Sequence, residues 1–113
     1  MKNDNKIKVD LRLEADQLLN STETAARLFE RGEVALLLYL PKDTDLQTPH
    51  KRDEIYIVIS GYGTFRRGSE LVRFSPGDAL FVAAHVPHRF ESYSGDFRCW
   101  VVLFGPERAA PAE

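Results

Sequence analysis

Residues 54–78 decide the fold of this 113-residue chain, and they read EIYIVISGYGTFRRGSELVRFSPGD. Three apolar, β-branched and aromatic runs of strand length lie at 55–59, 62–67 and 70–74. Turn signals follow them at Arg67-Gly-Ser-Glu70 and at Ser75-Pro-Gly-Asp78. Runs of the same kind continue on both sides, at 34–40, 79–83, 89–93 and 97–104. This regular spacing of short strands predicts an all-β fold, a closed antiparallel sandwich or barrel.

The first 32 residues carry the one helical signal that we find in the sequence. Asn20 and Glu23 have the spacing of a helix cap, a helix-compatible run follows, and Gly32 is a natural stop. We therefore expect one short N-terminal helix at about 21–31, within an N-terminal segment 1–32. The barrel should span about 33–104, with a C-terminal tail at 105–113. A chain of this length holds one modest core, so we expect a single domain, 1–113.

Composition and charge argue against several classes of partner. Charged residues make up 28% of the chain and the formal net charge is −2, which gives no reason to expect nucleic acid or an anionic membrane. The polar N-terminus lacks a signal-peptide pattern, and the longest apolar run, at 34–40, is too short to cross a bilayer. Cys99 is the single cysteine and lies in an apolar run, so we expect a buried residue rather than a nucleophile. We expect a cytoplasmic protein.

Alternation along the strand at 54–59 predicts a face for each side chain. Glu54, Tyr56 and Val58 share one face, and three isoleucines share the other. Since both faces are largely apolar, one should line the barrel, and the other should be covered by a second sheet, by the N-terminal segment or by a second subunit. Cover by a second subunit would make the protein a homodimer, and we expect a homodimer. A buried Glu54 would need a proton, hydrogen-bond donors or a metal cation.

Two motifs add a family resemblance to this pattern. The first is Thr48-Pro-His50-Lys-Arg-Asp-Glu54, followed by six residues and Gly61. The second begins at Pro76-Gly-Asp78 and ends at Val86-Pro-His88. Together they resemble the two motifs of the cupins, with Thr48 at the place of the first histidine and His85 at the place of a glycine. The resemblance covers about 34–104 and implies a double-stranded β-helix, the jelly-roll cupin barrel.

The resemblance also implies a metal site. It places His50, Glu54 and His88 at the positions of metal ligands, and leaves Thr48 in place of a fourth. Three protein ligands leave three positions open on a six-coordinate ion, as in non-haem Fe(II) oxygenases, although Zn, Mn or Ni would also fit. The cofactor we expect is therefore a divalent metal ion of open identity. The alternative is a cupin that has lost its metal and keeps the three residues as polar groups at the barrel mouth.

Five further residues are candidates for the surroundings of the metal. Gln47 and Thr48 could hold a water or a substrate oxygen. Tyr56 and Phe90 share the parity of the predicted ligands and should line the same cavity, with core packing as the alternative. His85 would point away from His88 in a regular strand, unless the backbone breaks at 86–87.

Two classes of function fit these residues. One is a metal-dependent enzyme, dioxygenase-like or isomerase-like, acting on a small organic molecule. The other is a non-catalytic module that binds a metabolite or a sugar as a sensor. Six arginines lie within or next to the predicted strands, and one that points inward could bind a carboxylate substrate. The sequence assigns no residue a catalytic role.

Overall fold

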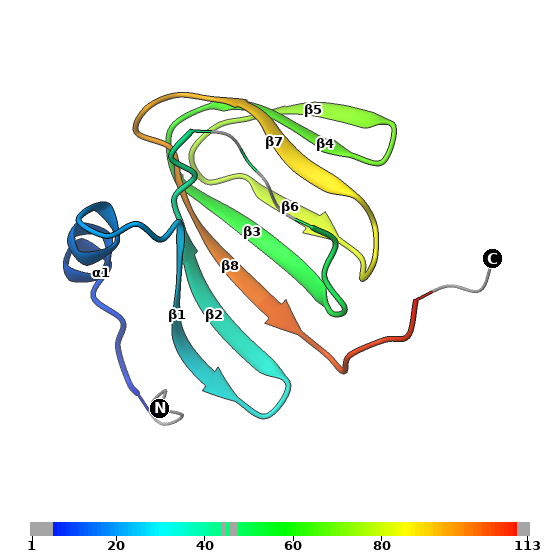
Figure 1. Cartoon of the computed structure of the whole chain (residues 1–113), viewed down its shortest axis with the longest axis horizontal. Coiled ribbons are helices and arrows are strands. Elements are labelled where there is room, and N and C mark those ends of the chain that lie inside the picture. The colour runs from blue at the N-terminus through cyan, green and yellow to red at the C-terminus, as the bar shows by residue number, and fades with distance from the viewer. Residues whose placement is uncertain (1–5, 44, 46–47, 111–113) are drawn as a thin grey trace.

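The computed structural model describes residues 6–43, 45 and 48–110. Two antiparallel sheets face one another, and one helix lies beside the larger sheet (Figure 1). The elements are α1 (Leu11–Leu19), β1 (Ala25–Arg31), β2 (Val34–Tyr39), β3 (Asp53–Ser60), β4 (Gly63–Arg67), β5 (Glu70–Phe74), β6 (Ala79–Val82), β7 (His88–Tyr93) and β8 (Arg98–Phe104). The larger sheet has the order β1-β2-β8-β3-β6, and the smaller has the order β5-β4-β7.

The predicted strands and the all-β class are confirmed. Each of the seven runs expected from 34 onward forms a strand whose ends lie within two residues of the prediction. All neighbouring strands in both sheets pair antiparallel. The local signals therefore sufficed here, because alternation and turn residues are properties of adjacent positions.

The position of the helix was predicted wrongly. It forms at Leu11–Leu19, where Asp10 caps it by accepting a hydrogen bond from the Leu13 amide at 3.2 Å. Asn20, the predicted N-terminal cap, is instead the C-terminal cap of this helix. One short helix is present as expected, but it precedes the predicted segment.

The segment expected to be helical, about 21–31, contains strand β1. Its backbone pairs with β2 from Ala25 opposite Tyr39 to Arg31 opposite Val34, and this pairing overrides a modest helical propensity. Gly32 does stop the segment, but as part of a hairpin turn, with a positive φ of 56°. The larger sheet therefore extends one strand beyond the predicted start of the barrel.

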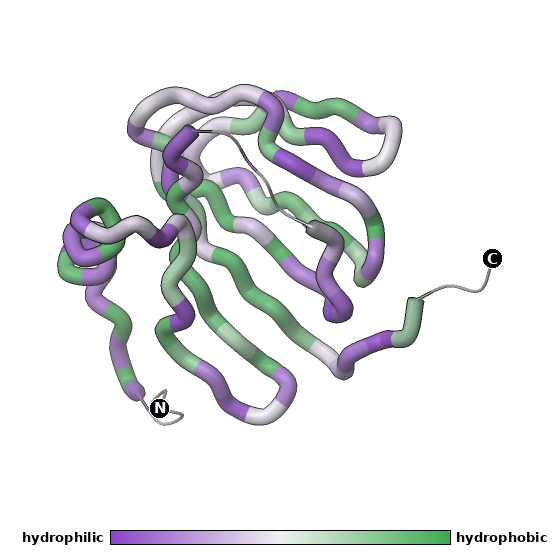
Figure 2. The backbone as a smooth tube through the Cα atoms, viewed as in Figure 1, coloured by the Kyte–Doolittle hydropathy of each residue, from purple (hydrophilic) through white to green (hydrophobic). Residues whose placement is uncertain are grey.

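The main core lies between the two sheets and is rich in aromatic rings. Phe90 lies at its centre, with its ring centroid 4.7 Å from Phe65, 4.7 Å from Phe97 and 5.0 Å from Tyr56. The predicted inward face of β3 is confirmed, because Glu54, Tyr56 and Val58 are all buried. Figure 2 shows the hydrophobic residues running along the strands of the larger sheet. Cys99 is also buried, and burial raises the pKa of its thiol well above the usual value, as expected for a packing residue.

The outer face of the larger sheet is covered only in part. The helix buries a second cluster against it, which comprises Ala15, Leu18, Leu28, Leu38 and Leu40. Beyond the helix, Val34, Ile57 and Phe81 keep 43%, 39% and 47% of their surface exposed. The N-terminal segment is thus one of the covers expected from the sequence, and the described residues leave the part of the face around Val34, Ile57 and Phe81 exposed to solvent. Among the described residues, no helix is long and apolar enough to span a membrane.

Asp45 anchors the segment that joins β2 to β3. One carboxylate oxygen accepts a hydrogen bond from the Tyr39 hydroxyl at 2.5 Å, and the other accepts one from the Phe90 amide at 2.7 Å. Burial, and then the bond to Asp45, raise the pKa of the Tyr39 hydroxyl. These contacts tie Asp45 to β2 and to β7, a few residues before the first motif.

Two glycines permit a close approach between neighbouring stretches of backbone. A Cβ on Gly63 would lie 2.0 Å from the Ser92 carbonyl oxygen of the neighbouring strand. Gly61, the glycine of the first motif, has a φ of 87°, and a Cβ there would lie 2.5 Å from the Phe97 backbone. Both positions therefore require glycine for steric reasons.

Candidate metal centre

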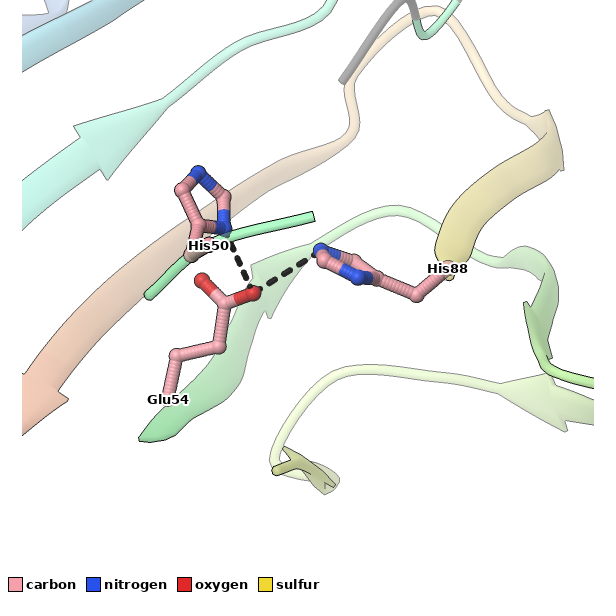
Figure 3. Close-up of side chains that lie close together, drawn as sticks. All are labelled: His50, Glu54 and His88. Carbon is pink, nitrogen blue, oxygen red and sulfur yellow. Dashed lines mark hydrogen bonds and ion pairs between the residues drawn. The ribbon is translucent and has the colours of Figure 1, made fainter. Parts of the chain in front are cut away.

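Three side chains from two segments that are distant in the sequence meet in one group. His50 lies on the segment before β3, Glu54 lies on β3, and His88 begins β7 (Figure 3). Glu54 pairs in register with Val82 and Leu103 of the larger sheet, whereas His88 pairs with Arg67 of the smaller one. The group therefore joins the two sheets.

Both imidazole rings point at the same carboxylate oxygen. His50 Nδ1 lies 2.9 Å and His88 Nε2 lies 2.8 Å from Glu54 Oε1, and the three ligand atoms all lie within 4.8 Å of one another. The side chains of Glu54 and His88 are 1% and 0% exposed, whereas that of His50 is 39% exposed. This group could hold a metal ion, and solvent would reach it from the His50 side.

The hydrogen bonds of His88 fix the state of its ring. Its Nδ1 donates to the Val86 carbonyl oxygen at 2.9 Å, so the other nitrogen, Nε2, faces the Glu54 carboxylate. A lone pair on Nε2 would repel that oxygen, so a cation must lie between them, either a proton on Nε2 or a metal ion. A backbone carbonyl that holds the second nitrogen in this way is the usual support of a metal-binding histidine.

The pKa shifts agree with this geometry. Burial alone would raise the pKa of Glu54, but the hydrogen bonds with His50 and His88 outweigh burial, and the pKa is lowered. Burial alone would lower the pKa of His88, but the bonds with Glu54 and with the Val86 carbonyl outweigh it, and the pKa is raised. Without metal, both shifts favour a carboxylate on Glu54 and a proton on His88. A metal ion would displace the proton from His88.

A divalent metal fits the remaining chemistry of the group. The second oxygen of Glu54, Oε2, is buried and has no hydrogen-bond partner among the described residues, which is uncommon for a buried carboxylate. Metal–ligand bonds of about 2.0–2.2 Å place adjacent ligand atoms about 3 Å apart. The separations of Glu54 Oε1 from His50 Nδ1 and from His88 Nε2, 2.9 Å and 2.8 Å, are compatible with that spacing, and all three ligand atoms lie within 4.8 Å of one another.

The structure places the other candidate residues at different distances from this centre. The Tyr56 hydroxyl lies 3.0 Å from His88 Nε2, directly beside the group. Phe90 packs among the aromatic rings of the core, so its contacts agree with the alternative of core packing. Thr48 is exposed, and Gln47 lies outside the described residues.

His85 is turned away from the centre but touches its backbone. It has a positive φ of 68°, which is uncommon for a residue other than glycine, and its amide donates to the His50 carbonyl oxygen at 2.7 Å. Its ring nitrogen Nε2 lies 2.6 Å from the Arg108 carbonyl oxygen. The alternation expected of a strand ends here, because β6 ends at Val82 and β7 begins at His88.

The C-terminal segment lies next to the site, and the sequence did not predict this. The Arg108 amide donates to the Lys51 carbonyl oxygen at 2.8 Å, and its guanidinium lies 3.5 Å from the Asp53 carboxylate. Arg52 donates from Nε to the Gly105 carbonyl oxygen at 3.0 Å. These bonds tie residues 105–108 to the segment that carries His50. No local signal could have revealed them, because the partners lie more than 50 residues apart.

Comparison with known proteins assigns the family. The sequence model of the cupin domain matches residues 35–104, which contain both motifs and all three residues of the group. The chain belongs to the cupin family. The cupin resemblance inferred from the two motifs is thereby confirmed.

One protein sequence and two solved structures illustrate what this chain is similar to. An uncharacterized protein of Streptomyces coelicolor, SCO3923, is 36% identical over 96 residues, which cover 84% of this chain and 91% of that protein. A cupin superfamily protein of Desulfitobacterium hafniense is 17% identical, with a TM-score of 0.62 and coverage of 92% and 97%. Fe(II) HppE is 22% identical, with a TM-score of 0.52 over 64% of this chain and 43% of that chain. The two solved structures share the fold with this cupin.

Proposed function

We propose that this cupin binds a divalent metal ion through His50, Glu54 and His88 and acts with it, as an enzyme, on a small organic molecule in the barrel. The observation that carries the proposal is the state of Glu54: it is 1% exposed, two imidazoles converge on one of its oxygens, and the other oxygen has no partner among the described residues. A metal ion would satisfy both oxygens and both rings. The Fe(II) form of a structural neighbour, HppE, adds support from the fold.

The arrangement of the protein residues suits a reaction at an open metal. When bound, the metal would supply Lewis-acid chemistry, or redox chemistry if it is iron. His88 and Glu54 are held rigidly by strands β7 and β3, whereas His50 lies at the solvent side. The Tyr56 hydroxyl, next to His88, can donate a hydrogen bond to a substrate oxygen. The aromatic core beneath it keeps water from the inner side of the site.

A non-catalytic binding module is the second candidate. The hydrogen bonds of Glu54 with both histidines close the group without any ion, and a cupin that binds a metabolite or a sugar could keep such a group. The Glu54 oxygen that has no partner within the described part of the chain argues for the metal. The dioxygenase-like or isomerase-like chemistry expected from the family resemblance is a further prediction within the enzyme proposal.

Metal analysis beside oxygen uptake tests the proposal. The wild-type protein and a His88→Ala variant are purified in parallel, and their metal content is measured by mass spectrometry. We expect close to stoichiometric metal in the wild type and a large loss in the variant. Near-zero metal in both would contradict the proposal. Oxygen uptake by the iron-loaded protein, triggered by members of a panel of small organic acids and sugars, would favour a dioxygenase over a binding module.

We also propose a homodimer through the open part of the outer face. Val34, Ile57 and Phe81 lie there on three strands of one sheet, and exposed apolar residues on a shared face favour association. Light scattering after size-exclusion chromatography should give twice the mass of the chain, and Ile57→Lys should give the monomer mass. A monomeric wild-type protein would contradict this part. The cytoplasmic location expected from the sequence stays a prediction.

A further inference from the structure

A cavity lies between the edge strands of the two sheets. Its volume is about 180 Å³, and it opens where β5 of the smaller sheet faces β6 of the larger one. Its lining is mainly apolar and includes one cation and one anion: Phe65, Arg67, Glu70, Val72, Ala79, Leu80 and Phe81. A volume of this size suits a ligand of a few heavy atoms, smaller than a drug-sized molecule.

Arg67 is the inward-pointing arginine that the sequence could not identify. Phe65 is buried in the core, and Arg67 follows it by two residues on β4, so both belong to the inner face. Arg67 on β4 pairs in register with His88 on β7, so Arg67 lies beside a residue of the candidate metal centre. Its guanidinium donates to the Phe81 carbonyl oxygen at 3.1 Å, so it reaches across the opening from one sheet to the other.

The ion pair of Arg67 is of a kind that a ligand can replace. Its partner is the Glu70 carboxylate at 2.7 Å, but the two side chains are 39% and 65% exposed. Exposed pairs of this kind contribute little to stability. A carboxylate on a ligand inside the cavity could therefore take the place of Glu70 on the guanidinium, and Glu70 would turn to solvent.

The charge of the smaller sheet favours an anionic ligand. Its three strands carry four arginines against two glutamates, although the whole chain has a net charge of −2. Glu91 already pairs with Arg66 at 2.9 Å and with Arg89 at 3.1 Å. Arg66, Arg73 and Arg89 lie on the outward face of this sheet, so the excess attracts anions to the sheet as a whole, and Arg67 is the cation among the residues that line the cavity.

We propose that this cavity binds a small organic carboxylate, whose charge pairs with Arg67 and whose apolar part packs on Phe65, Val72 and Leu80. The ring of Phe65 also lies 6.2 Å from that of His88 and 5.7 Å from that of Tyr56, so it separates the cavity from the candidate metal centre by one aromatic side chain. If the protein is the enzyme of the proposed function, this carboxylate is part of its substrate, and that step rests on the proposed function. Binding itself does not require the metal.

An NMR titration of the metal-free protein tests the proposal. The probe is 3-methylbutanoate, and its neutral amide, 3-methylbutanamide, has the same shape without the charge. We expect saturable shifts of backbone amides in β4, β5 and β6, with the amide binding at least tenfold more weakly. Arg67→Gln should lower the affinity at least tenfold. Glu70→Gln should raise it, because it removes the competing carboxylate.

The matched control is Arg73→Gln, which removes an arginine from the outward side of β5 and should leave the affinity within twofold. Equal binding of the acid and the amide would overturn the proposal, as would undiminished affinity of the folded Arg67→Gln variant or shifts confined to other strands. The titration is made with chelator present, so its failure leaves the metal proposal standing, and a failure to find metal leaves the carboxylate site standing.

Discussion

Replacing Glu54 by methionine should make the metal-free protein more stable while abolishing its response to metal. The substitution removes a carboxylate that is 1% exposed and puts an apolar chain of similar length into a core of aromatic and aliphatic residues. An unpartnered buried acceptor destabilises a protein by about 1–3 kcal/mol, and the buried Oε2 atom disappears with the substitution. The lost bonds to His50 and His88 act in the opposite direction.

The structure indicates that both histidines keep hydrogen-bond partners after the substitution. His88 can become neutral, with Nδ1 still donating to the Val86 carbonyl and Nε2 accepting from the Tyr56 hydroxyl. His50 is 39% exposed and can bond to water. Since exchange of buried ionic groups for apolar ones of similar volume ranges from neutral to about 4 kcal/mol stabilising, we expect a gain of about 1–2 kcal/mol. The lowered pKa of Glu54 does not oppose this, because it compares the carboxylate only with its protonated form.

Urea denaturation with and without Zn(II) measures both effects. At pH 7.5 with chelator, the midpoint should rise in Glu54→Met. With free Zn(II) at about 100 times its dissociation constant, the wild type should gain about 2.7 kcal/mol and the variant nothing. Glu70→Met, at an exposed strand glutamate, should keep the wild-type response to zinc. A loss of more than about 2 kcal/mol without metal, or a zinc response in Glu54→Met, would refute the reasoning.

Three further perturbations test how the fold supports the site. Gly63→Ala should lower the free energy of unfolding, measured in urea, by more than about 3 kcal/mol, because the added Cβ would overlap a backbone carbonyl. The control is Gly95→Ala, whose Cβ would meet nothing within 4 Å and which should change the free energy of unfolding by less than about 0.5 kcal/mol. Asp45→Ala should lower it by about 2–4 kcal/mol because two buried donors lose their acceptor; a loss below about 1 kcal/mol would contradict this. Arg108→Pro removes the amide that donates to the Lys51 carbonyl next to His50, and it should weaken zinc binding in calorimetry by about tenfold. The control variant Ala110→Pro should leave the zinc affinity unchanged. Equal affinities of the two variants would show that the C-terminal segment does not position His50.

The strands could be predicted because their signals are local. Alternation of side chains in β3 and the turn residues at 67–70 and 75–78 act over a few positions, so single-sequence reasoning found them. The helix was misplaced for the opposite reason. Residues 25–31 become a strand because β2 pairs with them, and the cap at Asp10 went unrecognised as the start of a helix.

The candidate site followed from motifs, but its supports did not. The cupin resemblance implied that His50, Glu54 and His88 would lie near one another, and they form one group in the structure. The bond from the Phe90 amide to Asp45, the bond from His85 to Arg108 and the contact of Arg67 with Phe81 depend on how distant segments fold together. Such contacts have no spacing that a single sequence reveals.

Anomalous scattering from a crystal soaked in Zn(II) tests the central claim most directly. Data collected above and below the zinc absorption edge should show one strong peak about 2.0–2.2 Å from His50 Nδ1, His88 Nε2 and a Glu54 oxygen. A crystal of His88→Ala soaked in the same way should lack the peak. A well-ordered wild-type site with no zinc peak, or a peak at other residues only, would contradict the account.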